Sequence, residues 1–593
     1  MKSCFLLFLS IALYAQDPPP QKETIVVTGS YEPIPIEDAD RAVRAIDLDA
    51  AQKLLSNTLF DFLRTDPSLD VQSRAPNGVQ TDLSIRGGDF GQTLVLLDGI
   101  RLNDAQSGHH DLDIPLPPDA VGRIEILKGA GSAIYGSDAV GGAINIISRA
   151  PESNELHLRT GIGNFGTNQQ SATLTTVWQP LTEQLSFSRD FSTGFMDDRD
   201  YRNLSLASIT HWHTALGSTD ITLAMNDRPF GANQFYGPYN EWERTRTWFA
   251  AIRQTFGKNT EASFAFRRHT DLFVLLRNDP AYYTNRHAVE GYQAALRRHN
   301  RLAQNTTLSY GGEAFRDEID SSNLGDHQRN YGAVYAAVDV RALKRYSFTL
   351  GAREEIFRGG ARQFNPTAAF GAWLNEHWKL RASASRAFRL PSYTDLYYHD
   401  PSTVGSPYLK PETAWGYDGA VEWHASRRIS GDAGIFYQRV RDGIDYVRAS
   451  PQDIWQAANH DRLNFIGVEA SLTIRPLPNQ SIDIRYTRLR GSEDSASSGL
   501  ESEYAFNYPV HDAIVTWQAA LPAGFLVRSR IGALQRIGND PYAVWDIYVA
   551  DRRGRWSPFA QFTNITDTHY QELTGIAMPG RAAIVGLDWK FGW

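Results

Sequence analysis

Alternation of apolar and polar residues through the last ~440 residues limits the folds open to this chain. From about residue 154 onward, segments of about ten residues are separated by turns or polar loops. In one segment Ile482 and Ile484 fall on one face of a strand, while Asp483 and Arg485 fall on the other. No helical stretch interrupts the pattern, and aromatic residues gather at the segment ends. It therefore favours a transmembrane β-barrel over a soluble sandwich.

The length of this region sets the size of the barrel. At about 20 residues per strand and connection, residues 154–593 predict about 22 antiparallel strands. A barrel of that size encloses an open lumen, so it needs a plug. Residues 39–153 suit that role as a compact α/β domain, with apolar residues on one helical face over 54–63 and short strands at 83–85, 93–97 and 123–127.

The N-terminal residues have a different character. Residues 1–16 combine a basic start, a short apolar run and a small residue, which is typical of a secretory signal peptide. Residues 17–38 predict an extended periplasmic tether, because prolines lie on both sides of a β-prone segment at 23–30. We expect that this segment does not anchor itself and is able to add a strand to a partner's sheet.

Composition excludes several classes of protein. With 59 basic and 67 acidic residues, the chain has no excess positive charge for binding nucleic acid. A single cysteine excludes a disulfide framework and a multi-cysteine metal site. We also predict that the protein is not an enzyme. Glu354 and Glu355 are adjacent, so on a strand they point to opposite faces, and the chain has no Gly-x-Ser-x-Gly elbow.

Charged residues inside a plugged barrel must be paired. We expect charged plug residues to pair with acidic residues of the barrel wall, such as Glu422 or Glu469, while glycines permit tight turns and close packing. The residues predicted for the plug core and the plug–barrel contacts are Arg86, Gly87, Asp98, Gly99, Arg101, Arg123, Glu125, Lys128 and Gly129.

Several motifs carry a specific resemblance. Residues 83–88, 95–103, 123–129 and 132–146 resemble the plug domain of TonB-dependent outer-membrane receptors, and residues 389–392, 408–412, 464–469 and 579–581 resemble patterns of the family's barrel. The resemblance implies a monomeric transporter in the outer membrane of a Gram-negative-type bacterium, which needs no cofactor and is driven by the periplasmic partner TonB. It also implies a TonB box, made of Glu23, Thr24, Ile25, Val26, Val27 and Thr28.

The ligand is predicted from loops and plug apices. Residues 226–236, 267–271 and 285–287 look most like the cobalamin-receptor branch, so we expect a corrinoid; a ferric siderophore or haem is the alternative, and a passive porin is a weaker one. Residues 75–80 and 103–111 should form outward apices of the plug, and a metal chelate would suit a histidine pair. The candidate ligand-binding residues are Asn77, Gln80, Asn103, Asp104, His109, His110, Asn233, Phe235 and Tyr236.

Aspartates early in the barrel suggest calcium. Some cobalamin receptors carry loop aspartates that bind this ion, and oxygen-rich loops suit it. The candidate ligands are Asp190, Asp197, Asp198, Asp200 and Asp227. Against this expectation, Arg199 lies inside the cluster and the spacing is not that of an EF-hand.

Overall fold

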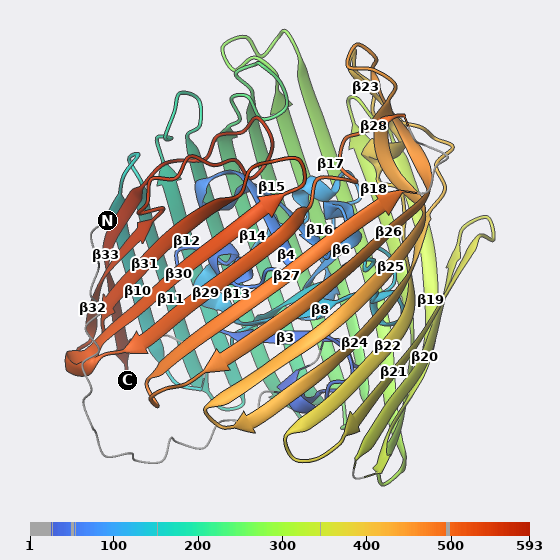
Figure 1. Ribbon diagram of the computed structural model, residues 1–593, viewed down its shortest axis with the longest axis vertical. Helices are drawn as coiled ribbons and strands as arrows, with labels where there is room; N and C mark the ends of the chain where they lie inside the picture. Colours follow the sequence, from blue (N-terminus) through green and yellow to red (C-terminus); the bar gives the residue numbers. More distant parts are fainter. Residues whose placement is uncertain are drawn as a thin grey trace, which may run out of the picture.

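A closed barrel surrounds a smaller N-terminal domain in the computed structural model (Figure 1). The structure describes residues 25–26, 28–48, 53, 55–150, 152–343, 345–493 and 499–593. Within these ranges no helix is long and apolar enough to cross a membrane. The predicted signal peptide, residues 1–16, lies outside the described residues.

The barrel closes because its first strand pairs with its last: Glu155 of β10 lies opposite Gly592 of β33. Twenty-two long strands are paired antiparallel in sequence order, which confirms the predicted fold class. The long strands are β10 (Glu155–Gly163), β11 (Asn168–Trp178), β12 (Leu181–Ser192), β13 (Tyr201–Thr214), β14 (Gly217–Gly231), β15 (Trp242–Phe256), β16 (Thr260–Val274), β17 (Thr284–Ala303), β18 (Thr306–Ser321), β19 (His327–Leu343), β20 (Tyr346–Phe357), β21 (Arg362–Trp373), β22 (Trp378–Arg389), β24 (Glu412–Ser426), β25 (Ile429–Arg448), β26 (Trp455–Ile474), β27 (Gln480–Glu493), β29 (Pro509–Ala520), β30 (Phe525–Arg536), β31 (Tyr542–Asp551), β32 (Trp556–Thr563) and β33 (Ala582–Gly592).

The two ends of the barrel differ in their connections. At one end the strands are joined by short turns, as between Trp178 of β11 and Leu181 of β12. At the other end loops are longer, and the loop between β22 and β24 carries α4 (Tyr393–Tyr397) and β23 (Thr403–Val404). A second two-residue strand, β28 (Glu501–Ser502), pairs with β25. In outer-membrane barrels the short turns face the periplasm and the longer loops face outward.

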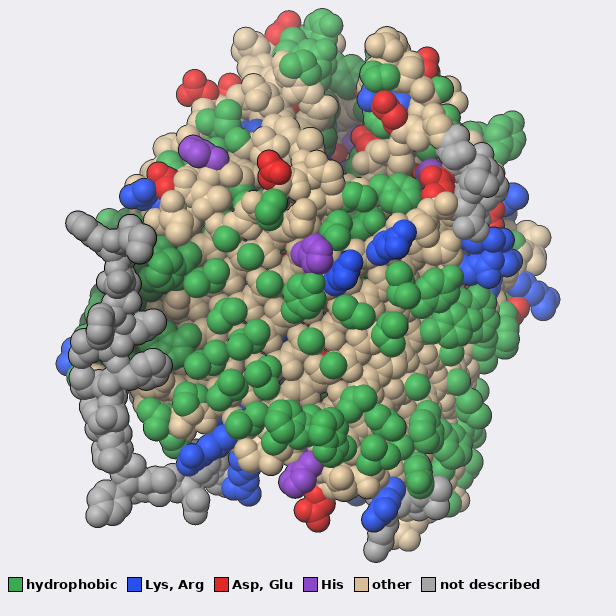
Figure 2. Space-filling view, viewed as in Figure 1, with side chains coloured by type: hydrophobic (Ala, Val, Ile, Leu, Met, Phe, Trp, Pro, Cys, Tyr) green, Lys and Arg blue, Asp and Glu red, His purple; other side chains and the backbone are tan. Residues whose placement is uncertain are grey.

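Alternation along the strands separates a lipid-facing surface from a polar lumen. Leu223, Leu296 and Ile435 are more than half exposed, and Figure 2 shows apolar side chains over a wide band of the outer wall. On β33, Val585 is exposed whereas Asp588 is buried, where it contacts His157 Nε2 at 2.6 Å. Tryptophans near the short-turn end complete the apolar surface, as expected for a membrane interface; they include Trp178, Trp212, Trp378 and Trp556.

The plug is built on a five-stranded sheet with the order β3-β8-β9-β6-β7 and a separate hairpin of β4 and β5. The strands predicted at 83–85, 93–97 and 123–127 lie within β5, β6 and β8. The plug elements are β1 (Ile25–Val26), β2 (Ile34–Pro35), η1 (Ile36–Asp38), β3 (Val43–Asp47), α2 (Phe60–Leu63), β4 (Leu69–Ala75), η2 (Pro76–Gly78), β5 (Val79–Ile85), η3 (Phe90–Gln92), β6 (Thr93–Leu97), β7 (Ile100–Arg101), η4 (Gly108–His110), η5 (Pro118–Ala120), β8 (Val121–Lys128), α3 (Ser132–Tyr135) and β9 (Gly142–Ser148).

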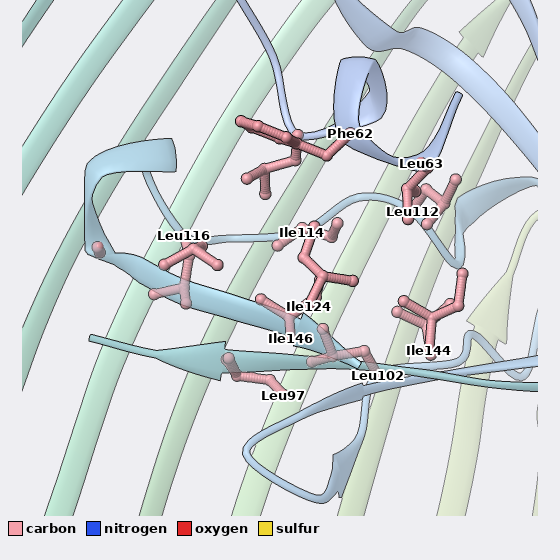
Figure 3. Close-up of a cluster of buried hydrophobic side chains, with 14 of the residues drawn as sticks. Phe62, Leu63, Leu97, Leu102, Leu112, Ile114, Leu116, Ile124, Ile144 and Ile146 are labelled. Atoms are coloured by element: carbon pink, nitrogen blue, oxygen red, sulfur yellow. The ribbon is translucent and has the colours of Figure 1, made fainter. Parts of the chain in front are cut away.

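An apolar core holds these elements together. Ile124 of β8 and Ile144 and Ile146 of β9 pack with Phe62 and Leu63 of α2 (Figure 3). Burying one such side chain stabilises a fold by about 1.5–3 kcal/mol. Of the predicted helical face, Phe62 and Leu63 lie in α2, Leu55 lies in a turn, and Leu54 lies outside the described residues.

A cavity of about 580 Å³ separates the edge strand β3 from part of the barrel wall. Val43 and Arg44 of β3 line it on the plug side, and Asp432 of β25, Ser471 of β26 and Arg485 of β27 line it on the wall side. The lining is rich in charged and hydroxyl groups, so the space suits water. The plug sheet therefore does not pack tightly against the whole wall.

Arg86 joins the plug to the wall through two carboxylates. Its Nε donates to Glu469 Oε1 at 2.8 Å, and its Nη2 donates to Asp418 Oδ2 at 2.9 Å. The guanidinium also lies 4.3 Å from the ring centroid of Phe436. Lys128 approaches Glu469 Oε2 at 3.6 Å. These contacts are the plug–wall pairing that was expected for Arg86 and Lys128.

Two other predicted residues pair inside the plug in the part of the chain that the structure describes. Arg101 pairs with Asp138 and Arg123 pairs with Glu125, all within the plug. The expectation of wall partners is therefore wrong for Arg101 and Arg123, because closer carboxylates satisfy them inside the plug. Glu422 in turn pairs with Arg381 of the same wall, at 2.9 Å.

The remaining predicted plug residues shape turns. Gly87, Gly99 and Gly129 have φ values of 84°, 80° and 84°, a region that favours glycine. The Asp98 Oδ1 accepts from the Ser148 amide at 2.9 Å, while its backbone carbonyl accepts from Arg253 of β15 at 3.3 Å. Asp98 therefore both stabilises a turn of the plug and contacts the barrel wall.

We expect Arg86→Met to destabilise the plug by about 3–5 kcal/mol, since it leaves the Asp418 and Glu469 carboxylates buried without this partner. Thermal unfolding and limited proteolysis of the purified protein in detergent would measure the loss. Arg553→Met is the matched control, because its pair with Asp551 lies on a turn where the arginine side chain is 58% exposed. Equal melting temperatures for both variants would contradict the assigned role of Arg86.

Candidate functional site

The hairpin of β4 and β5 places its tip against the outward ends of the barrel strands. Asn77 has a φ of 59°, in the left-handed region that asparagine tolerates at turns. Its amide donates to the hydroxyl of Tyr201 at the start of β13. The Gln80 amide donates to the hydroxyl of Tyr236 in the loop between β14 and β15. The structure thus brings together three predicted ligand-binding residues, Asn77, Gln80 and Tyr236, near one rim of the barrel.

The loop between β14 and β15 supplies the rest of this group. The Phe235 ring lies 4.4 Å from the Arg199 guanidinium, and the Asn233 carbonyl accepts from Arg199 Nε at 2.6 Å. Arg199 also donates to the backbone carbonyl of Arg74, at 2.9 Å. The arginine therefore ties two barrel loops to the hairpin tip.

His109 extends the surface with aromatic groups. Its ring stacks on Phe90 with centroids 4.1 Å apart, and Tyr504 meets Phe90 edge-on at 5.1 Å. The His109 Nδ1 lies 2.8 Å from Asp82 Oδ1. Burial lowers the pKa of His109, outweighing the opposite effect of Asp82.

Asp82 is held ionised beneath these rings. Burial alone raises its pKa, but the Arg74 guanidinium and His109 outweigh that effect and lower the pKa to about 2. Arg74 Nη1 donates to Asp82 Oδ2 at 2.8 Å. The pair fixes the hairpin without leaving a free charge.

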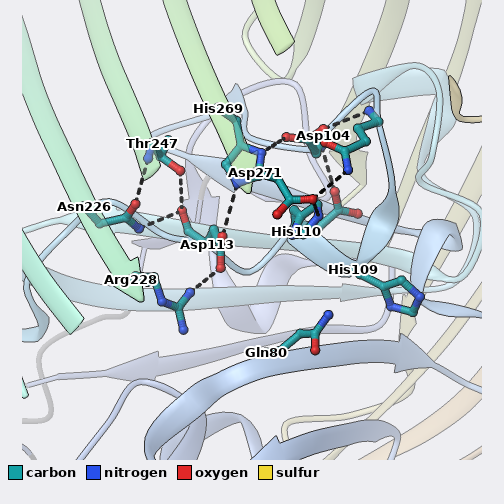
Figure 4. A network of polar contacts seen from close by, with 12 residues as sticks. Gln80, Asp104, His109, His110, Asp113, Asn226, Arg228, Thr247, His269 and Asp271 are labelled. Carbon is teal, nitrogen blue, oxygen red and sulfur yellow. Dashed lines mark hydrogen bonds and ion pairs between the residues drawn. The ribbon is translucent and has the colours of Figure 1, made fainter. Parts of the chain in front are cut away.

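The second predicted apex, residues 103–111, is different. Asp104 and His110 are only 7% and 5% exposed, so the prediction of an outward apex is wrong for them. Arg267 of β16 pairs with Asp104 at 2.8 Å. The Asn103 side chain accepts from the Val95 amide and donates to Asp111 Oδ2, both at 2.7 Å. This segment is an internal brace between plug and wall (Figure 4).

The described arginines around Tyr236 are engaged by acidic groups or by backbone carbonyls. Arg277 is held by Asp198 and Asp200, and Arg228 is held by Asp113. Burial raises the pKa of Glu241 to about 7, and burial together with Asp445 raises the pKa of Glu503 to about 7. The surface thus combines aromatic and amide groups with arginines that are already engaged.

The N-terminal segment packs on the plug in its described part. Ile25 and Val26 pair with Pro35 and Ile34, and Val26 is fully buried. The Thr28 amide donates to Glu125 Oε2 at 2.8 Å. The expectation that this segment does not anchor itself is therefore wrong for Val26 and Thr28. Glu23, Thr24 and Val27 of the predicted box lie outside the described residues.

Comparison with known proteins decides the family. Residues 148–565 match the family model described as TonB dependent receptor-like, beta-barrel, and residues 35–143 match the TonB-dependent Receptor Plug Domain. This chain belongs to the TonB-dependent receptors. The receptor is therefore a transporter of the outer membrane that works with TonB, and it is not an enzyme.

The relatives of this receptor include a vitamin B12 transporter and an iron-regulated protein. It is 24% identical over 487 residues to the vitamin B12 transporter BtuB of Vibrio vulnificus, covering 77% of this chain and 76% of that protein. It is also 24% identical over 561 residues to an iron-regulated outer membrane virulence protein of Vibrio cholerae, covering 86% of this chain and 84% of that protein.

Solved structures support the fold alone. The siderophore receptor PirA from Pseudomonas aeruginosa superposes with a TM-score of 0.73 at 19% identity, covering 93% of this chain and 99% of that chain. The FrpB iron transporter from Neisseria meningitidis gives a TM-score of 0.78 at 15% identity, covering 93% of this chain and 100% of that chain.

The predicted calcium aspartates of the receptor are divided among separate partners. Asp198 and Asp200 share Arg277, Asp227 is bound by Arg244 and Arg246, and Asp190 accepts from the Tyr201 hydroxyl at 3.3 Å. Asp197 is exposed. Within the described residues these five do not form one carboxylate cluster, and arginine occupies the places that a cation would take. This arrangement does not fit a calcium ion, and calcium binding stays an untested prediction.

Sequence reasoning missed several residues of the site. Each of them contacts a predicted ligand-binding residue that is distant in the sequence or separated from it by a turn. They are Tyr201, Arg74, Phe90 and Tyr504. Arg74 and Phe90 lie beside recognised plug motifs, so their position was a usable signal. Tyr504 lies in a loop whose local sequence carries no comparable signal.

Asn103→Ala is expected to loosen the plug, because it leaves the Val95 amide and the Thr93 carbonyl without their side-chain partner. The cost is roughly 1–3 kcal/mol for each buried group left unsatisfied. Hydrogen exchange of β6 and thermal unfolding would detect it. Asn168→Ala, at an exposed hydrogen bond to Gln170 on the wall, is the control. An Asn103 variant with unchanged stability but weaker ligand binding would instead favour direct contact with the ligand.

Proposed function

We propose that this receptor imports a corrinoid, cobalamin or a close relative of it, across the outer membrane by TonB-coupled transport. The observation that carries this proposal is the chemistry of the outward surface around Gln80, His109 and Tyr236. It offers aromatic rings and amides, and its described arginines are engaged by carboxylates or carbonyls.

Ligand charge separates the two candidate classes. Ferric complexes of catecholate siderophores are strongly anionic, and haem carries propionates, so both favour sites with uncommitted arginine or lysine. Cyanocobalamin carries no net charge and is edged by amide groups. Because Arg277 is held by Asp198 and Asp200, and Arg199 by backbone carbonyls, an anionic ligand would have to compete with these partners for each guanidinium.

The comparisons leave both ligand classes open, because a vitamin B12 transporter and an iron-regulated protein match at the same identity. The local resemblance of residues 226–236 to the cobalamin branch supports the corrinoid, since this stretch includes Asn233, Phe235 and Tyr236. A siderophore or haem is the second candidate.

Energy coupling is proposed to act through the N-terminal segment. An added TonB strand would pair with the β-prone residues around Ile25 and Val26. The next described residue, Thr28, is bound to Glu125 of β8, and its hydroxyl accepts from Asn145 of β9 at 3.1 Å. A pull on the segment is therefore delivered directly to two neighbouring strands of the plug sheet.

Binding of cyanocobalamin, a ferric catecholate siderophore and haem to the purified receptor tests the ligand class, with and without calcium. We expect saturable binding of cyanocobalamin alone, weakened at least tenfold by Tyr236→Ala. Tyr346→Ala, at an exposed ring on the outer wall near the short turns, is the control. Tight binding of the siderophore or haem without binding of the corrinoid would overturn the proposal and leave the transporter class intact.

Val26→Pro tests the coupling segment. Proline lacks the amide that strand pairing needs, so ligand uptake by cells should be lost. Equilibrium binding to the purified receptor should change less than twofold, because Val26 lies far in sequence from the outward surface. Pro33→Ala, at an exposed position of the same segment, should retain uptake. Normal uptake by the Val26 variant would show that the box is placed wrongly.

A further inference from the structure

A histidine and two carboxylates from three separate elements meet where the plug contacts the wall. His110 ends η4, Glu243 lies on β15 and Asp271 lies on β16. One potential ligand atom from each lies within 4.8 Å of the others. His110 Nε2 is 3.6 Å from Asp271 Oδ2. All three side chains are buried, and Figure 4 shows His110 and Asp271 facing one another.

No arginine or lysine pairs with the carboxylates of this cluster among the described residues. Glu243 and Asp271 are 2% and 6% exposed. Glu243 Oε2 accepts from the Tyr236 hydroxyl at 2.9 Å, and Asp271 Oδ2 accepts from Gln106 Nε2 at 3.0 Å. The second oxygen of each, Glu243 Oε1 and Asp271 Oδ1, is buried without a hydrogen-bond partner. Burying such oxygens unpartnered is costly, and a bound cation is one way to satisfy both at once.

The neighbouring histidine and aspartates are already paired with one another or with arginine. His269 lies between two carboxylates, with Nδ1 2.9 Å from Asp104 and Nε2 3.2 Å from Asp113. Asp104 is further bound by Arg267, and Asp113 by Arg228. His110, Asp113 and His269 also lie close enough to form a three-ligand group. However, Asp113 is already bound by Arg228, and His269 already lies between Asp104 and Asp113. The carboxylate oxygens left without a partner here belong to Glu243 and Asp271, and Gln106 beside them also has an unpartnered side-chain oxygen.

We propose that His110, Glu243 and Asp271 bind one divalent transition-metal ion of the Zn²⁺ class between the plug and the barrel wall. A neutral imidazole with two carboxylates balances a double positive charge. Nitrogen and oxygen ligands at about 2.0–2.2 Å from a tetrahedral Zn²⁺ lie about 3.4 Å apart, close to the 3.6 Å between His110 and Asp271. The imidazole favours such an ion over calcium, which prefers oxygen ligands alone.

The position of the site gives the ion a mechanical role. It joins the internal brace at residues 103–113 to β15 and β16, so a bound ion is a removable cross-link between the two domains. Tyr236, which is 45% exposed on the outward surface, donates its hydroxyl to the ligand carboxylate of Glu243. A change at the outer surface therefore reaches the coordinating oxygen through a single side chain.

Metal binding to the intact receptor tests this inference. The purified protein, stripped with a chelator and dialysed, is titrated with Zn²⁺ by calorimetry and with Co²⁺ by visible absorption. We expect one high-affinity ion per chain and a Co²⁺ spectrum of low coordination number. Glu243→Gln and Asp271→Asn, which keep side-chain size, should each weaken Zn²⁺ binding at least tenfold.

His109→Asn and Glu241→Gln are the matched controls, since each alters a similar group one or two residues from a proposed ligand. Both should retain the high-affinity ion. Thermal unfolding provides a second readout: Zn²⁺ should raise the melting temperature of the wild type and of the controls, but not of the two ligand variants. No stoichiometric binding, or equal binding by all variants that remain folded, would overturn the proposal.

Discussion

Backbone hydrogen bonding in lipid is the constraint on which the rest of this structure depends. A strand edge within the hydrocarbon layer leaves amide and carbonyl groups unsatisfied, so the sheet must close on itself. Here closure requires that β10 find β33 across more than 400 residues of chain. Closing with 22 strands opens a lumen too wide for wall side chains to fill, and the plug occupies that space.

A plug in a polar lumen is held differently from an ordinary core. Its own interior is apolar, as Ile124 and Ile144 show, but its contacts with the wall are dominated by paired charges. Arginine is well suited to this interface because one guanidinium serves two carboxylates, as Arg86 does for Asp418 and Glu469. Paired charges hold the plug in one position inside the barrel. Water that enters the interface is able to replace each of these contacts in turn.

Features that depend on residues close together in the sequence were predictable, whereas contacts between residues distant in the sequence were mostly not. The barrel was readable because alternation on a strand is local: Ile484 faces outward and Arg485 lines an interior cavity, as their spacing indicated. The pairing of Arg86 with Glu469 was anticipated because a buried guanidinium needs a carboxylate and Glu469 belongs to the acidic wall. Arg101 was assigned to the wall incorrectly, since no local rule reveals that Asp138 turns back toward it. Likewise, the burial of Asp104 and His110 depends on wall strands that sequence alone does not position.

The cavity beside β3 has a mechanical consequence. β3 is the edge strand of the plug sheet. It is joined to β8 by five residue pairs, and its other side faces the cavity. A strand that is pulled from one end and has a cavity on its free edge loses its residue pairs one at a time. A strand that is hydrogen-bonded on both edges must break all its pairs together. The void therefore sets where the sheet yields first, and it makes the force needed for yielding depend on a few hydrogen bonds rather than on the whole domain.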